Sequence, residues 1–211
     1  MLTSRIWHIY HDIGSTACLA GDCDIAAKMF TQAIEICSNR SMQRNKVKSL
    51  IGLADTLVMQ KQAAEATRTY KRALNIFARI GAPEHADKRM LAHVLEKLGY
   101  LYEQEDRQED AIKMLQRSVR VSEQIIGAKH PSLVHRLLKI ASLHIRFNET
   151  EESMACFNRV QEIRSLTNEH PLALPADAVA VDEPDLLQAA EIGATPPLQL
   201  DRARTTAQAF P

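Results

Sequence analysis

Residues 95–121 read LEKLGYLYEQEDRQEDAIKMLQRSVRV, and this stretch decides the fold. On both sides of the charged turn Glu105-Asp106-Arg107, apolar residues recur at intervals of three and four, the pattern of two amphipathic helices. Gly99 lies inside the first helical run, where a glycine costs about 1 kcal/mol relative to alanine. Such a glycine is expected where two helices approach too closely for a side chain to fit. The stretch therefore predicts a tightly packed helical hairpin.

Three further segments of the chain align with this one, namely residues 10–36, 50–76 and 137–163. In each, a small residue is followed twelve positions later by a second small residue, and four positions after that by a bulky one. These structural repeat anchors are Gly14, Ala26 and Phe30; Ala54, Ala66 and Tyr70; Gly99, Ala111 and Leu115; and Ala141, Ser153 and Phe157. The first anchors of successive segments are 40, 45 and 42 residues apart, so the chain is built from a repeat.

The repeats predict an all-α fold of eight helices over roughly residues 4–167. The four helical hairpins are expected at about 4–40, 43–81, 84–127 and 131–167, and they should stack into a right-handed α-solenoid. Short polar turns divide the hairpins, at residues 20–22, 60–62, 105–107 and 148–150. Between hairpins, Gly81 precedes Pro83 and Gly127 precedes Pro131, which is typical of one helix ending and the next beginning.

The composition changes after residue 168, because six of the eight prolines lie beyond it. Residues 168–211 are therefore predicted to be a mostly disordered, Pro-rich acidic tail, with one short helix at 184–193. In that helix Leu186, Leu187 and Ala190 would serve either as a partial cap on the last repeat or as a linear motif for another protein. Residues 168–211 contain seven acidic and two basic residues, so they carry net −5 and leave +5 on the repeats.

Charge and composition argue against several classes of protein. The formal net charge is zero, and the basic segment 39–48 has no interleaved aromatic residues, so nucleic-acid binding is not expected. No run approaches the roughly 18 apolar residues of a membrane span, and the N-terminus lacks the apolar core of a signal peptide. The four cysteines form no CxxC pair, which indicates reduced thiols in a cytoplasmic protein.

Motifs for catalysis, metal binding and cofactor binding are not found in the sequence. His8 and His11 lie one helical turn apart and Cys18 follows, but a structural zinc site normally takes four ligands at recognised spacings. The acidic residues between Glu103 and Asp110 surround an expected surface turn, and their charge favours the N-terminus of the following helix. We therefore expect no enzyme activity, no metal and no cofactor.

The anchor residues resemble those of the tetratricopeptide repeat, and the long spacing is similar to the variety found in kinesin light chains. The closest local match is IIGAKHPSLVHRLLKIASLH, residues 125–144. The resemblance implies a concave groove, lined by the first helix of each hairpin, that binds a protein or peptide. Its expected residues are His8, His11, Ser15, Lys48, Ile51, Asp55, His93, Glu96, Tyr100, His135, Leu138 and Arg146. The asparagines with which the family often grips a peptide backbone are absent from the matching positions.

Four of these groove residues, His8, Lys48, His93 and His135, occupy the same position in successive repeats and should form a row. They are either solvated polar residues or pH-sensitive donors to an acidic ligand, since imidazoles titrate near neutrality. The acidic tail would then be able to fold back on the groove and compete with an acidic partner.

The sequence therefore predicts a cytoplasmic, non-enzymatic adaptor that binds a partner peptide or helix in its groove. Two alternatives remain open. One is a chaperone or assembly subunit, similar to the tetratricopeptide chaperones of bacterial secretion systems. The other is a homo-oligomeric scaffold that buries a terminal repeat face in a self-contact.

Overall fold

The structure, a computed structural model, describes residues 2–81 and 84–169. In this part of the chain there are eight α-helices, two short 3₁₀-helices and no strand, as the repeats predict. The α-helices are α1 (Leu2–Ala20), α2 (Cys23–Ile36), α3 (Gln43–Met59), α4 (Ala63–Ile80), α5 (His85–Gln104), α6 (Gln108–Ile126), α7 (Val134–Arg146) and α8 (Thr150–Glu169). The 3₁₀-helices η1 (Arg40–Met42) and η2 (Pro131–Leu133) precede α3 and α7. Pro83, the expected helix 184–193 and the expected cap residues Leu186, Leu187 and Ala190 lie outside the described residues.

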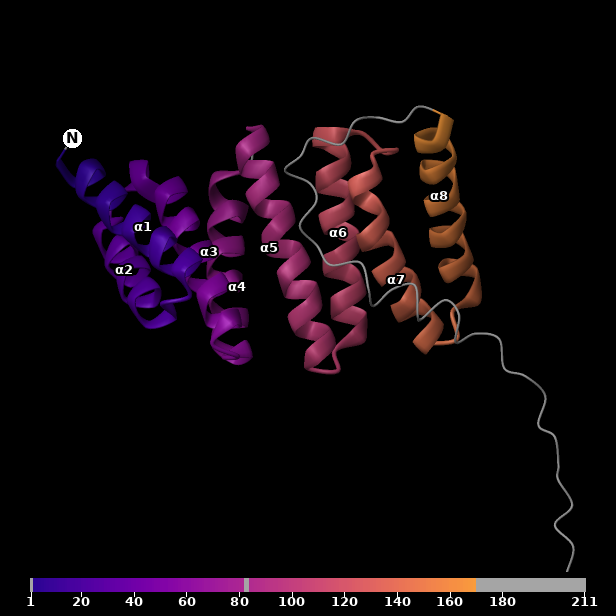
Figure 1. Ribbon diagram of the computed structural model, residues 1–211, viewed down its shortest axis with the longest axis horizontal. Coiled ribbons are helices and arrows are strands. Elements are labelled where there is room, and N and C mark those ends of the chain that lie inside the picture. Colours follow the sequence, from indigo (N-terminus) through magenta and orange to yellow (C-terminus); the bar gives the residue numbers. More distant parts are fainter. Residues whose placement is uncertain (1, 82–83, 170–211) are drawn as a thin grey trace, which may run out of the picture. The chain divides into compact units, whose positions relative to one another are not determined.

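The helices form four hairpins that stand side by side in chain order (Figure 1). Within each hairpin the two helices pack together, and the second helix of one hairpin packs on the first helix of the next. The first helices also meet across hairpins, because α1 contacts α3 and α3 contacts α5. Helices on the inner side of a curved stack are the ones that come closest, so α1, α3 and α5 line the inner face of the α-solenoid. The Tyr100 hydroxyl of α5 lies 2.7 Å from Nε2 of His135 on α7, which places α7 on the same face.

Each hairpin turns in the same way. One residue in each turn has a positive φ, between 57° and 84°. The amide of the next residue donates to the carbonyl five positions earlier, as from Asp22 to Ala17 (2.9 Å) and from Arg107 to Tyr102 (2.8 Å). This is the Schellman arrangement, which satisfies the free carbonyls at a helix end. The residues with positive φ are Gly21, Lys61, Asp106 and Asn148.

The glycines inside the first helices mark close helix contacts. A Cβ atom added to Gly99 would lie 2.7 Å from Cγ of Leu115, and one added to Gly14 would lie 3.0 Å from the Phe30 ring. Both pairs are sixteen positions apart, so the first small anchor of a hairpin meets its bulky anchor. The prediction that Gly99 and Gly14 allow close approach is confirmed.

Phe30 also makes a contact that the repeat pattern did not indicate. A Cβ atom on Gly52, in the first helix of the next hairpin, would lie 2.5 Å from Cζ of the Phe30 ring. The ring is only 2% exposed, and from α2 it inserts as a wedge between α1 and α3. The positions equivalent to Gly52 in the third and fourth repeats are Lys97 and Lys139, which explains why the repeat alignment did not single it out.

The small and bulky anchors lie in the core, with Phe157 as the exception. Ala26, Ala66 and Ala111 have no exposed surface, whereas the Phe157 side chain is 39% exposed. Phe157 lies on α8, and the described residues contain no later helix to cover it as α3 covers Phe30.

Candidate partner-binding groove

The twelve expected groove residues all lie on the first helices of the hairpins, and we call them the groove face. Each is exposed or half-buried, and none is buried. They come from α1 (His8, His11, Ser15), α3 (Lys48, Ile51, Asp55), α5 (His93, Glu96, Tyr100) and α7 (His135, Leu138, Arg146). Many of them are engaged with a side chain of the neighbouring repeat.

Between α1 and α3 the groove face is held by one buried hydroxyl group. The Trp7 indole N–H donates to Oγ of Ser49 at 2.9 Å, and Nδ1 of His11 lies 3.3 Å from the same oxygen. The Trp7 and His11 rings stack with their centroids 4.7 Å apart. Burial lowers the pKa of His11, and the charge of Lys48 adds to this effect. His11 therefore favours the neutral form and acts as a packed ring more than as a cation.

Between α3 and α5, Asp55 joins two repeats. Its carboxylate accepts a hydrogen bond from the Tyr70 hydroxyl and lies 3.0 and 3.2 Å from Nε2 of His93. Burial, together with the Asp55 charge, raises the pKa of Tyr70, so the phenol remains a donor. The imidazole of His93 is thus directed at Asp55.

Between α5 and α7, Glu96 and Arg136 form a largely buried ion pair. Nη2 of Arg136 lies 2.6 Å from Oε2 of Glu96, and the two side chains are 19% and 17% exposed. The Tyr100 hydroxyl donates to Glu96 at 3.4 Å and lies 2.7 Å from Nε2 of His135. Burial is the main cause that raises the pKa of Tyr100, with the charge of Glu96 next. The chain Arg136–Glu96–Tyr100–His135 is therefore a continuous polar network.

Glu103 completes the link between α5 and α7. Its carboxylate lies 2.8 Å from Nζ of Lys139 and 3.3 Å from Nη1 of Arg146. The Glu103 side chain is 14% exposed. Sequence reasoning treated Glu103 as part of an exposed acidic turn, which is wrong, because α7 covers it with two cations.

Sequence reasoning missed several partners of the groove face, among them Ser49, Arg136 and Lys139. The cross-repeat pairs share one signal, since their members lie 35 to 43 residues apart, which is about one repeat. A search for opposite charges at that spacing would have found Glu96–Arg136 and Glu103–Lys139.

The row of His8, Lys48, His93 and His135 is divided by these contacts. His93 faces Asp55 and His135 faces Tyr100, so both are engaged within the protein. Among the described residues, neither His8 nor Lys48 has a hydrogen-bond or ion-pair partner, although His8 lies edge-on to the Trp7 ring at 4.7 Å. The free positive charge of the groove face is therefore at its α1–α3 end.

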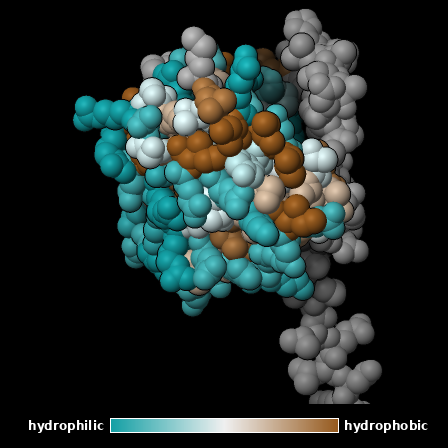
Figure 2. All heavy atoms as spheres, turned by 90° about the vertical axis from the view of Figure 1, so that its left-hand side faces the viewer, coloured by the Kyte–Doolittle hydropathy of each residue, from teal (hydrophilic) through white to brown (hydrophobic). Residues whose placement is uncertain are grey.

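A second exposed surface lies at the α1–α2 end of the stack, where Figure 2 shows apolar side chains gathered among polar ones. We call it the terminal apolar face. Its exposed members are Leu2 (72%), Ile9 (57%) and Ile13 (45%) on α1 and Ile25 (51%) on α2. In the third repeat, the residues equivalent to Ile9 and Ile13 are Val94 and Leu98, which are fully buried. At Ile9 and Ile13, the terminal apolar face is thus the surface that the third repeat buries against a neighbour.

Two negative findings concern the part of the chain that the structure describes. Nowhere in residues 2–81 and 84–169 do three or more His, Cys, Asp or Glu side chains gather in a way that would hold a metal ion. None of the described helices combines the length and the apolar character that crossing a membrane requires.

A sequence model described as tetratricopeptide repeat matches residues 6–79, 45–118 and 90–165 of this chain. No curated protein matches it. The solved structure of BtubC (BKLC) from P. vanneervenii is similar, with a TM-score of 0.62 and 17% identity, over 96% of this chain and 71% of that chain.

Two Rap structures are similar in fold as well. The apo form of RapI gives a TM-score of 0.66 at 12% identity, over 78% of this chain and 58% of that chain. A Rap protein complexed with competence and sporulation factor gives 0.58 at 10% identity, over 78% of this chain and 44% of that chain. At such low identities the likeness concerns the fold alone.

Proposed function

Because the chain belongs to the tetratricopeptide-repeat family, we propose that it is a protein–protein interaction adaptor that holds a peptide or helix of a partner protein on its groove face. One observation carries the proposal: the first helix of every repeat, α1, α3, α5 and α7, carries solvent-accessible groove-face side chains. A Rap protein of similar fold, described in complex with competence and sporulation factor, supports a binding role for this architecture.

The contacts between repeats favour binding because they hold the groove face in one arrangement. Asp55, Glu96 and Tyr100 are already fixed by neighbours in the free protein, so a partner would lose little free energy in ordering them. The half-buried Ile51 and Leu138 offer apolar contacts for a helix or an extended peptide. Lys48 and His8, which are free of partners among the described residues, would attract an acidic group at the α1–α3 end.

In this proposal the protein works by binding, without a chemical step, in the cytoplasm. Gating by residues 168–211 is a further part of it. These residues carry net −5 and are tethered to the repeats, so their effective concentration can reach the millimolar range. They would therefore compete with an acidic partner for Lys48 and His8.

Affinity capture followed by quantitative binding tests the proposal. The partner captured by the full chain should bind Ile51→Glu/Leu138→Glu at least tenfold more weakly, because both apolar contacts are replaced by unpaired charge. Arg117→Glu/Arg120→Glu, at two exposed sites on the second helix α6, is the matched control and should bind normally. Equal affinity of the groove variant would contradict the groove assignment.

Gating is tested by comparing the full chain with a chain that ends at residue 169. Tighter partner binding by the shorter chain is the expected result. If both chains bind the partner with the same affinity, residues 170–211 do not compete for the groove.

The terminal apolar face favours a second candidate function, that of a homo-oligomeric scaffold or an assembly subunit. Leu2, Ile9 and Ile13 expose a helical stripe that internal repeats cover, and exposed apolar stripes often mark protein contacts. We expect the sedimentation mass to exceed one chain of 23.7 kDa at micromolar concentration and to fall to one chain in Ile9→Asp/Ile13→Asp. A wild-type mass of one chain, with no partner held on this face, would refute this candidate.

A further inference from the structure

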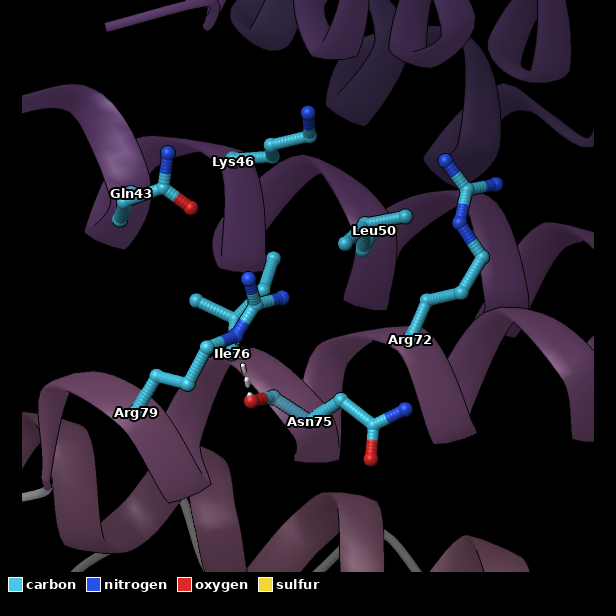
Figure 3. Close-up of a pocket in the computed structure, with 7 residues that line it drawn as sticks. All are labelled: Gln43, Lys46, Leu50, Arg72, Asn75, Ile76 and Arg79. Atoms are coloured by element: carbon cyan, nitrogen blue, oxygen red, sulfur yellow. Dashed lines mark hydrogen bonds between the residues drawn. The ribbon is translucent and has the colours of Figure 1, made fainter. Parts of the chain in front are cut away.

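A hollow of about 290 Å³ lies between α3 and α4 (Figure 3). Its floor contains Leu50 and Ile76, which are 0% and 5% exposed. Around the floor stand three cations, Lys46 of α3 and Arg72 and Arg79 of α4. Figure 3 shows the two arginines extending from α4 toward α3. We call this site the α3–α4 hollow.

Among the described residues, the cations of the α3–α4 hollow have no acidic counterpart. Gln43 and Asn75 supply amides to its rim, and none of its lining residues is acidic. Within the part of the chain that the structure describes, no carboxylate forms an ion pair with Lys46, Arg72 or Arg79. Nε of Arg79 donates to the carbonyl of Asn75 at 3.2 Å, which leaves its terminal nitrogens free.

The positive charge of the repeats is concentrated in this hairpin. Residues 43–80, which span α3 and α4, contain eight basic and two acidic residues. Residues 84–169 contain 13 basic and 14 acidic residues and are nearly neutral. An acidic ligand is therefore attracted to the second hairpin more than to the rest of the described chain.

The α3–α4 hollow is distinct from the groove face. Gln43, Lys46 and Leu50 share one side of α3 because they are spaced by three and four. The groove residues of α3 are spaced in the same way, but they lie roughly 140° further round the helix axis. A ligand in the α3–α4 hollow thus leaves the groove face open.

We propose that the α3–α4 hollow binds an acidic peptide segment, and that its occupant is residues 182–187 of the same chain, Asp-Glu-Pro-Asp-Leu-Leu. This segment brings three carboxylates to three unpaired cations, and two leucines to the apolar floor. It is the densest acidic cluster of residues 170–211, which carry six acidic and two basic residues. The inference places residues 182–187 in the α3–α4 hollow, so the competition proposed at Lys48 and His8 would rest on the remaining acidic residues of the tail, Asp177, Glu191 and Asp201.

The chain is long enough for this contact. α4, α5, α6, α7 and α8 pack in succession, and packed helix axes are about 8–10 Å apart, so four steps span at most about 40 Å. Asp182 lies thirteen positions after Glu169, where α8 ends, and an extended chain of that length reaches at most about 45 Å.

A peptide competition experiment on the full chain tests the proposal. The probe is a fluorescent peptide with the sequence of residues 180–190, AVDEPDLLQAA. The recipient is the full chain with Asp182→Asn, Glu183→Gln and Asp185→Asn, whose own segment no longer supplies carboxylates. This neutralised chain should bind the probe at least tenfold more tightly than wild type, whose α3–α4 hollow is occupied.

Further variants, made on the neutralised chain, locate the bound probe. Adding Arg72→Glu and Arg79→Glu should weaken probe binding at least tenfold, and raising NaCl from 0.05 to 0.5 M should also weaken it, because charge pairs at this surface are screened. Adding Arg117→Glu and Arg120→Glu instead makes the same change in charge at a site away from the α3–α4 hollow. This control should have little effect on the affinity for the probe. Circular dichroism verifies that each variant is folded.

Three results would overturn the proposal. The first is that the neutralised chain and wild type bind the probe equally, since the tail then does not occupy the site. The second is binding that survives Arg72→Glu/Arg79→Glu. The third is that Lys48→Glu, made on the neutralised chain without the two arginine substitutions, abolishes probe binding. That result would assign the acidic segment to the groove face.

Discussion

Replacing Gly52 by alanine tests how tightly the first two repeats are packed. The new Cβ would lie 2.5, 2.6 and 2.9 Å from three carbons of the Phe30 ring, whereas ordinary contacts are 3.4–4 Å. The ring would have to move by about 1 Å, which is a large shift in a close-packed core. On its other side the ring lies only 3.0 Å from the position of a Cβ on Gly14, so it has little space to retreat.

Two opposing terms set the size of the effect. Overpacking a core costs about 1–3 kcal/mol. Alanine in place of glycine inside a helix stabilises the folded protein by about 1 kcal/mol. We therefore expect Gly52→Ala to lower the free energy of unfolding by about 1 kcal/mol.

Urea unfolding followed by Trp7 fluorescence measures this change, since Trp7 is the only tryptophan and bonds to Ser49 at the same junction of repeats. A double-mutant cycle with Phe30→Leu isolates the contact: with the ring replaced, Gly52→Ala should become neutral or stabilising. If Gly52→Ala alone raises the free energy of unfolding by about 1 kcal/mol, helix propensity is the only effect. The wedge argument would then be refuted.

Three further predictions follow from single sites. Because the pKa of His11 is lowered in the folded protein, the unfolded chain binds a proton on this imidazole more readily. The free energy of unfolding should therefore fall as the pH drops from about 7 through the pKa of the unfolded chain, near 6.5. Urea midpoints of wild type should shift more with pH than those of His11→Gln. Cys37 is fully buried and burial raises its pKa, so iodoacetamide should modify it at least tenfold more slowly than the half-buried Cys23, as peptide mass mapping will measure. Arg136→Met removes the cation beside Glu96, whose side chain is 17% exposed, and should lower the free energy of unfolding by about 1–3 kcal/mol; an unchanged urea midpoint would show that the ion pair does not contribute.

The repeat, the helices and their turns were predictable because they depend on short-range patterns. Gly99 and Leu115 belong to one hairpin, and their spacing of sixteen recurs as Gly14 and Phe30, so both contacts follow from alignment. The turn at Gly21 closes through backbone bonds within six residues, and the same geometry recurs at Lys61. Local periodicity determines such features before any repeat meets another.

The sites depend instead on the angle and offset at which successive hairpins stack. The sequence indicated which helices line the groove face, but only the tertiary structure pairs His93 with Asp55 and covers Glu103 with cations of α7. These partners lie about one repeat apart, and a small rotation between hairpins would separate them.

By itself, then, the sequence determined an all-α chain of four repeated hairpins with a close-packed small residue, glycine or alanine, at the centre of each, because each hairpin is specified by residues near one another in the chain. The tertiary structure alone decided that the Phe30 ring would pack against Gly52. It also decided that most polar groove residues would pair across repeats, and that Lys46, Arg72 and Arg79 would surround one hollow. The physical reason is that side chains from different helices meet only after packing of the apolar faces has set the position of each helix.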